Sequence, residues 1–283
     1  MEQNGYRPTL TSTRIMLYVA GVLVLAIGFS LYILTSQTDR YFARTVASLI
    51  TAAFLGGSYW SAAELEFVSG RDRLWVNTRP SIPTMTIFTF LTLTVTLVHV
   101  DKFQFNAPLL ITRVGTWVWL LVYLLVPVIL TILFVRQVRT PGMDPPRRFP
   151  LARWIRWVLI LLAVVFLLLG ASLLIVPLTV APVWPWPLSP LTGRAIGAWF
   201  IGLSVLTGQA AWENDIIRVR GAMASLSAFS LLQFLALARY ENEVDWGHPT
   251  ASIYVLVLFL LGLIGVSQSL KARAIVREEQ TAS

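Results

Sequence analysis

The sequence predicts an all-α integral membrane protein with eight transmembrane helices, arranged as two parallel four-helix pseudo-repeats with both termini in the cytoplasm. Of its 283 residues, 56% are hydrophobic and 13% are charged, whereas soluble proteins have about 45–50% and about 25%. The basic residues lie in short segments between long apolar runs. Nucleic-acid binding needs bases gathered on one soluble face, so we expect a lipid bilayer as partner and no nucleic acid.

The apolar runs give the number of spans. A helix that crosses the hydrocarbon core needs about 20 apolar residues, and eight runs in this chain approach that length with no charged residue in their central parts. The first run is too long for the core of a signal peptide, so we interpret it as a retained span. The predicted spans are 15–35, 45–63, 82–100, 114–135, 155–176, 195–213, 222–239 and 251–270.

The distribution of Lys and Arg predicts the orientation, because cytoplasmic loops are enriched in these residues. With eight spans, 16 basic residues fall on the side that carries both termini and 6 fall on the opposite side. We therefore expect both termini in the cytoplasm. The predicted regions are a cytoplasmic tail (1–14), a first transmembrane unit (15–138), a basic proline-rich cytoplasmic linker (139–153), a second transmembrane unit (154–270) and a cytoplasmic tail (271–283).

Similar segments recur at matching places in the two predicted units. The segment ARTVASLI at 43–50 resembles GRAIGAWF at 193–200, which places Arg44 and Arg194 at the same entry on the outer side. AELEFVSGRDR at 63–73 resembles WENDIIRVRG at 212–221 in the order of its acidic and basic residues. Four spans per unit is an even number, so we expect two parallel halves related by an axis along the membrane normal.

The second pair of segments predicts a paired-charge clamp on the cytoplasmic side. A helix C-terminus disfavours anions, and the arginine fork matches a carboxylate well, so we expect carboxylates and arginines to pair within each loop. An alternative is a symmetric site for a cation or polar headgroup between Glu64 and Glu213. The candidate residues are Glu64, Glu66, Arg71, Arg73, Glu213, Asp215, Arg218 and Arg220.

A polar stripe predicts an interior face on the third span. Thr89, Thr92 and Thr96 recur at helical spacing, and Ser230 and Gln233 lie on the seventh span. The stripe is typical of hydrogen bonding between helices. It would equally line a hydrophilic cavity between the halves, and that cavity would distinguish a transporter from a packed scaffold.

The sequence offers little for metal or cofactor chemistry. It has no cysteine, and its two histidines are His99 and His248, so these are the candidate ligands for a haem or pigment. The repeat aligns Arg239 with His99, which argues against a symmetric pair of histidine ligands. No phosphate-binding loop, nucleophile elbow or zinc-protease motif occurs, so no catalytic residue is predicted and an enzyme is not favoured.

The segment WPWPLSPLTGRAIGAW at 184–199 resembles a segment of uncharacterised bacterial multi-pass membrane proteins. The resemblance implies a bacterial cytoplasmic (inner) membrane and implies no activity. Because no ionisable residue is expected inside the spans, the sequence favours an accessory or scaffold subunit of a membrane assembly, with other membrane-protein subunits as partners. The alternatives are an uncoupled transporter of a small or lipid-like substrate, with its site between the halves, and a pigment- or haem-binding subunit.

Overall fold

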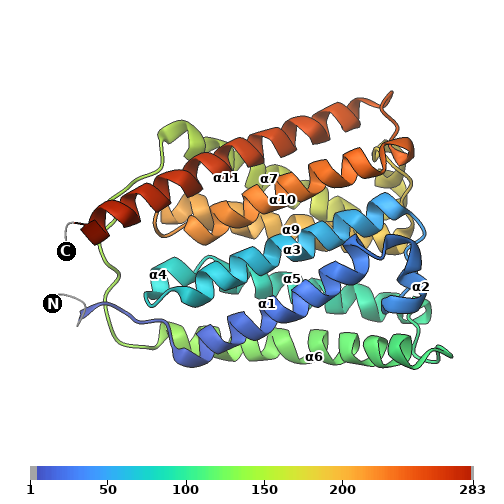
Figure 1. Cartoon of the computed structure of the whole chain (residues 1–283), viewed down its shortest axis with the longest axis horizontal. Helices are drawn as coiled ribbons and strands as arrows, with labels where there is room; N and C mark the ends of the chain where they lie inside the picture. The colour runs from blue at the N-terminus through green and yellow to red at the C-terminus, as the bar shows by residue number, and fades with distance from the viewer. Residues whose placement is uncertain (1–4, 282–283) are drawn as a thin grey trace.

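A computed structural model describes residues 5–281, which form a bundle of helices that run along one long axis (Figure 1). Within this range eight helices have 18 residues or more, and three short helices lie in the connections. The long helices are α1 (Thr11–Tyr32), α3 (Leu49–Arg71), α5 (Ser81–Val98), α6 (Leu110–Val138), α7 (Arg153–Ile175), α9 (Pro190–Glu213), α10 (Arg220–Arg239) and α11 (Pro249–Thr281). The short helices are α2 (Thr38–Tyr41), α4 (Trp75–Thr78) and α8 (Pro177–Val180).

Seven of the long helices in the described range are apolar enough to cross a membrane. The eighth long helix is α3, which corresponds to the predicted span 45–63 but continues to Arg71. The extension brings two glutamates into the helix and lowers its hydropathy. Most of α3 is nevertheless buried, because α1 and α10 cover it. The all-α fold is therefore confirmed, and seven of the eight predicted spans are candidate membrane spans by length and composition.

Local sequence fixes where the central helices α3 and α9 begin. Ser189 caps α9 in a capping box with Thr192, and Pro190 occupies the first helical position, where a missing N–H does no harm. Ser48 caps α3. The carboxylate of Glu243 adds a second cap there by accepting hydrogen bonds from the Ser48 hydroxyl, at 3.0 Å, and from the Leu49 and Ile50 N–H groups. Glu243, in the loop between α10 and α11, thus ties the start of α3 to the second half of the chain.

The helix contacts follow a symmetric pattern. α1 packs on α3 as α7 packs on α9, and α5 packs on α6 as α10 packs on α11. The third long helix of each half crosses to the other half, so that α5 packs on α9 and α10 packs on α3. The two halves are consequently interlocked. The N- and C-terminal ends of the described chain lie at the same end of the bundle (Figure 1).

Small residues allow the close approach of neighbouring helices. A Cβ on Gly56 of α3 would lie 2.5 Å from the backbone nitrogen of Tyr32 in α1. In the second half, a Cβ on Gly197 of α9 would lie 2.8 Å from the Gly170 oxygen of α7. Corresponding helix pairs therefore both depend on glycine, as small-residue packing in lipid requires.

We expect Gly56→Ala to destabilise the fold, because the new methyl group meets backbone that cannot rotate away. Overpacking of this kind costs about 1–3 kcal/mol, which thermal unfolding in detergent would register as a lower midpoint. Gly115→Ala in α6 is the matched control, since a Cβ added at Gly115 would have no neighbouring atom within 4 Å. Equal midpoints for the two variants would contradict the proposed close contact.

The WPWP segment packs into the bundle. Trp184 and Trp186 are buried, and the Trp186 ring nitrogen donates to the Thr51 hydroxyl at 3.0 Å. The prolines bend this connection back onto the bundle, where the rings pack against Phe54, Phe200 and Tyr254. Trp154 and Trp157 at the opposite end are exposed, as an interfacial position requires.

Candidate functional site

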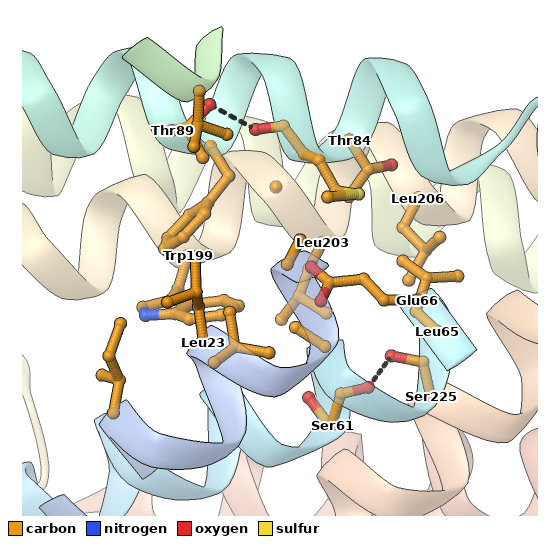
Figure 2. A pocket seen from close by; sticks show the side chains of 18 of the residues that line it. Leu23, Ser61, Leu65, Glu66, Thr84, Thr89, Trp199, Leu203, Leu206 and Ser225 are labelled. Carbon is orange, nitrogen blue, oxygen red and sulfur yellow. Dashed lines mark hydrogen bonds between the residues drawn. The ribbon is translucent and has the colours of Figure 1, made fainter. Parts of the chain in front are cut away.

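An internal cavity of about 70 Å³ lies at the junction of the two halves. Its walls come from α1, α3, α5, α6 and α9, with Ser225 contributed by α10. The lining is mainly apolar, and Glu66 is the one carboxylic acid that the described residues place in it (Figure 2). A cavity of this size exceeds the roughly 10–15 Å³ that one water requires. It therefore has room for a small polar group.

The Glu66 side chain has no hydrogen-bonding or ionic partner within residues 5–281. It is 3% exposed, and its Oε2 atom is buried without a partner. Figure 2 shows its carboxyl group projecting from α3 toward Leu203 of α9, among the side chains that line the cavity. An isolated ionised carboxylate in apolar surroundings is strongly disfavoured, so this group needs a proton or a cation.

The hydroxyl groups around the cavity have already used their protons. Ser61 and Ser225 donate to backbone carbonyls at 2.7 and 2.8 Å. Thr84 and Thr89 donate to the carbonyls of Pro80 and Met85, each at 2.8 Å. These four hydroxyls can therefore offer only lone pairs to a ligand. Together with Glu66 they favour a ligand that donates hydrogen bonds.

A groove between α1 and α6 borders the cavity. It has a volume of about 180 Å³ and shares Leu23, Ile27, Val122 and Tyr123 with the cavity. The other side chains of the groove are predominantly apolar. The groove and the inner cavity therefore share one wall.

Aromatic side chains separate this cavity, called the inner cavity, from a second one. The second cavity lies toward the end of the bundle away from the two termini and is called the outer cavity. The Tyr59 and Tyr123 hydroxyls are 2.7 Å apart, and Trp199 packs against Tyr59 and Phe88 with ring centroids 4.9 and 4.0 Å apart. Trp199 lines both cavities. The cluster divides the interior into two compartments along the bundle.

The outer cavity has a volume of about 30 Å³ and is lined by Arg44, Thr92 and Thr96 among mostly apolar side chains. The threonine stripe of the sequence therefore faces cavities along α5, with Thr89 in the inner one and Thr92 and Thr96 in the outer one. Thr96 also accepts a hydrogen bond from the Trp119 ring nitrogen at 3.1 Å.

Ser230 and Gln233 of α10 do not line either cavity. The Ser230 hydroxyl donates to the Leu258 carbonyl at 2.7 Å. The Gln233 amide donates to the Phe54 carbonyl at 3.0 Å and accepts from Tyr254 at 3.2 Å. Their polar groups join α10 to α3 and α11, which is the helix-packing role that the sequence left open beside cavity lining.

His99 contacts Arg194, which the sequence repeat aligns with Arg44. The Arg194 Nη1 atom lies 2.9 Å from His99 Nε2. Because a guanidinium can only donate, His99 Nε2 is the acceptor and the ring is neutral with its proton on Nδ1. Partial burial lowers the pKa of His99, and the positive charge of Arg194 lowers that pKa further.

We expect Arg194→Gln to raise the pKa of His99, because the variant removes a positive charge beside the ring. An NMR titration of the histidine ring resonances measures this shift. Arg113→Gln is the control, since Arg113 is an exposed arginine of the same end and is not among the charges that shift His99. A His99 pKa that is identical in the two variants would rule out the Arg194 contact.

The two histidines that the sequence offers as cofactor ligands each have a polar neighbour. His99 Nε2 is occupied by Arg194, and His248 Nδ1 lies 2.7 Å from the Thr250 hydroxyl. No group of three or more His, Cys, Asp or Glu side chains suited to a metal occurs between residues 5 and 281. The neighbours of each ring therefore account for its orientation without a haem or pigment.

The charge clamp combines one ion pair within a loop with pairs that cross between the halves. Arg79 Nε contacts Glu213 Oε1 at 2.5 Å, and Arg220 forms a two-pronged contact with Asp72 at 2.6 and 3.1 Å. Each arginine lies at the start of the third long helix of its half, and each acid lies at the end of the second long helix of the opposite half. Arg218 completes the network at 3.1 Å from Glu213.

The other predicted members of the clamp have different surroundings. No ion pair joins Glu64 or Glu66 to Arg71 or Arg73 in the described part of the chain. The helix α3 continues through both glutamates to Arg71, which leaves Glu66 buried inside the bundle and Glu64 half-buried. Asp215 instead accepts hydrogen bonds from the N–H groups of Arg148, Phe149, Ile217 and Arg218. It fixes the linker against the loop that precedes α10.

Sequence reasoning missed Asp72 and Arg79 as partners in this network. The repeated segments pointed to the correct loops, but pairing within a loop was the simpler expectation. A signal was present in Arg79, which occupies the same place before its helix as Arg220 does before α10. Comparison of the chain with protein-family models, with curated proteins and with solved structures finds no match.

Proposed function

We propose that this protein is a membrane carrier that binds a small, mainly apolar molecule bearing a protonated amine and exchanges it for a proton at Glu66. The observation that carries the proposal is the buried carboxyl of Glu66, which has no partner in the described structure and projects into a cavity. Ionisable groups inside a membrane bundle mark substrate or proton pathways in general.

The chemistry of the cavity matches an ammonium group. An ammonium has three N–H donors and no acceptor, and the cavity offers a carboxylate and four hydroxyls that can only accept. The faces of Phe88, Tyr123 and Trp199 line the same space, and aromatic faces attract organic cations. A neutral alcohol of the same shape would leave Glu66 without its cation.

Exchange follows from the need to neutralise Glu66 in both states. In the empty state the carboxyl carries a proton. When an ammonium binds, that proton leaves to the solvent and the carboxylate pairs with the ammonium, so one positive charge replaces another. The ammonium keeps all its hydrogens, and no covalent bond forms.

The lateral groove supports an amphiphilic substrate. The apolar body of the molecule would occupy the space between α1 and α6, and its ammonium would reach Glu66 past Leu23 and Val122. This route agrees with the lipid-like substrate expected for a transporter from the sequence. The proposed carrier differs from that expectation because it couples transport to a proton. The sequence predicted an uncoupled transporter, since the apolar runs gave no reason to expect an acid inside the bundle.

The symmetric helix contacts support two related halves. Crossing of α5 onto α9 and of α10 onto α3 places the cavity where both halves contribute walls, as in carriers built from repeats. We further propose that α3 is the eighth span, that both termini face the cytoplasm, and that the host membrane is the bacterial inner membrane, as the basic residues and the WPWP resemblance imply.

The accessory-subunit interpretation rested on the expectation that no ionisable group lies within the spans. Glu66 removes that reason, so the carrier is the better interpretation. The haem- or pigment-binding interpretation is less favoured, because the Nε2 atom of His99, one of its two candidate ligands, is engaged by Arg194.

Calorimetry on the full-length protein in detergent tests the proposal, with phenethylamine as the probe and 2-phenylethanol as its neutral counterpart. We expect the amine to bind and the alcohol to bind much more weakly. Repeating the titration in buffers of different ionisation enthalpy should show release of about one proton per amine near neutral pH, as linkage to a protonated carboxyl requires. Equal binding of amine and alcohol would refute the proposal.

A further inference from the structure

The outer cavity is lined by the side chain of Arg44, a buried guanidinium that has no hydrogen-bond partner in the described chain. Arg44 is 4% exposed, and its side chain makes no hydrogen bond or ion pair with any residue in the range 5–281. It lines the outer cavity together with Thr92, Tyr59 and Trp199. The five N–H donors of its guanidinium therefore have no hydrogen-bond partner among the described residues.

Arg44 remains charged despite its burial. Desolvation lowers the pKa of its guanidinium to about 10, which is still far above neutral pH. A buried charge without a counter-charge is strongly disfavoured. The structure thus leaves a positive charge that a ligand has to balance.

The neighbouring charges do not supply that balance. Arg194 adds a second positive charge nearby, and its side chain is engaged by His99 and by the Leu174 carbonyl at 3.0 Å. His99 is neutral as an acceptor from Arg194. Of the acids at this end, Asp101 has a side chain that is 64% exposed and pairs with Lys102 at 3.0 Å, Asp39 pairs with Arg40, and Glu243 caps α3. The outer cavity is therefore electropositive.

The polar groups that line the outer cavity differ from those of the inner one. The Thr92 hydroxyl has no partner in the described structure and is free to donate, whereas the hydroxyls around Glu66 have donated their protons to backbone. A guanidinium and a free hydroxyl present donors. Donors and positive charge together select an anion.

We infer that the outer cavity binds a small monovalent anion of halide size through Arg44 and Thr92. A cavity of about 30 Å³ holds about two waters by the roughly 10–15 Å³ that each needs. Chloride fits that space, whereas a sulfate or a long-chain carboxylate exceeds it. Tyr59 and Trp199 separate this anion site from Glu66, so the inference does not depend on the proposed carrier function.

Bromide quenching of tryptophan fluorescence tests the inference on the full-length protein, because Trp119 and Trp199 line the cavity. We expect a saturable component at low bromide concentration that chloride displaces and sulfate does not. Arg44→Gln should weaken that component at least tenfold, and Arg44→Lys, which keeps the charge, should retain part of it. Arg40→Gln is the control, since Arg40 belongs to the same end of the bundle and its side chain is 67% exposed.

The thermal midpoint gives a second readout that does not depend on fluorescence. Chloride should raise the midpoint of the wild-type protein and of Arg40→Gln, and should leave Arg44→Gln unchanged. If Arg44→Gln does not fold, two other results test the inference. The wild type should prefer chloride over sulfate, and Arg44→Lys should bind bromide more weakly than the wild type. Purely collisional quenching in the wild type, or equal displacement by sulfate, would overturn the inference, as would recovery of a long-chain carboxylate bound at Arg44.

Discussion

Glu66→Gln is expected to abolish proton release on amine binding and to weaken binding of phenethylamine by about 10- to 150-fold. A hydrogen bond to a charged group contributes about 1.5–3 kcal/mol, and each 1.4 kcal/mol changes an affinity about tenfold. Glutamine keeps the size of the side chain and removes both the negative charge and the exchangeable proton. Calorimetry in two buffers measures the affinity and the proton count in one experiment.

Glu64→Gln is the matched control for this prediction. Glu64 lies on the same helix, two residues before Glu66, but it is only half-buried and does not line the cavity. Its replacement should leave both the affinity and the proton count at the wild-type values. Equal losses in the two variants would mean that charge on α3, and not the cavity carboxyl, governs binding.

The Glu66 variant also distinguishes the two proposals about ligands. Glu66→Gln should leave bromide quenching intact, because the aromatic cluster around Trp199 separates the cavities. Arg44→Gln should leave amine binding intact for the same reason. Loss of both activities in both variants would indicate one continuous site.

The amino-acid sequence was sufficient to predict the class of fold, and the reason is physical. Long apolar runs in a bilayer must form helices, because each backbone polar group has to be satisfied within its own segment. The lengths of those runs placed most helices to within a few residues. The end of α3 was placed too early, because the apolar run stops at Ala63 while the helix continues to Arg71 under the cover of α1 and α10.

The candidate site could be predicted only in part. Thr89, Thr92 and Thr96 were correctly assigned to an inward face, because helical spacing determines which residues share a side. Whether an inward polar group meets a cavity or a partner depends on the shape of the neighbouring helices. Ser230 and Gln233 are inward but packed, and their spacing carries no sign of that difference.

The crossed ion pairs show a second limit of the sequence. Arg79 and Glu213 are 134 residues apart, and Asp72 and Arg220 are 148 apart. A pattern within one loop cannot reveal such partners. The crossing of α5 and α10 between the halves brings these distant residues together, and that crossing follows from packing against the whole bundle.

Glu213→Gln is expected to destabilise the folded protein by about 3 kcal/mol, because removing one partner of a buried ion pair leaves its other partner uncompensated. The Glu213 carboxylate is fully buried and contacts both Arg79 and Arg218, whose side chains are 15% and 7% exposed. Arg79 retains its contact with Asp144 at 2.7 Å. Arg218 loses its one carboxylate partner within the described structure. We expect this loss to account for most of the destabilisation.

Thermal or denaturant unfolding in detergent measures this prediction, with two further variants to set the scale. Asp39→Asn removes an exposed pair at 3.9 Å whose side chains are 57% and 67% exposed, and such pairs contribute about 0–1 kcal/mol. Asp72→Asn should fall between the two, because its partner Arg220 is 29% exposed and is partly solvated after the change. If all three variants unfolded alike, the crossed pairs would be surface contacts. The interlocking of the halves would then depend on apolar packing alone.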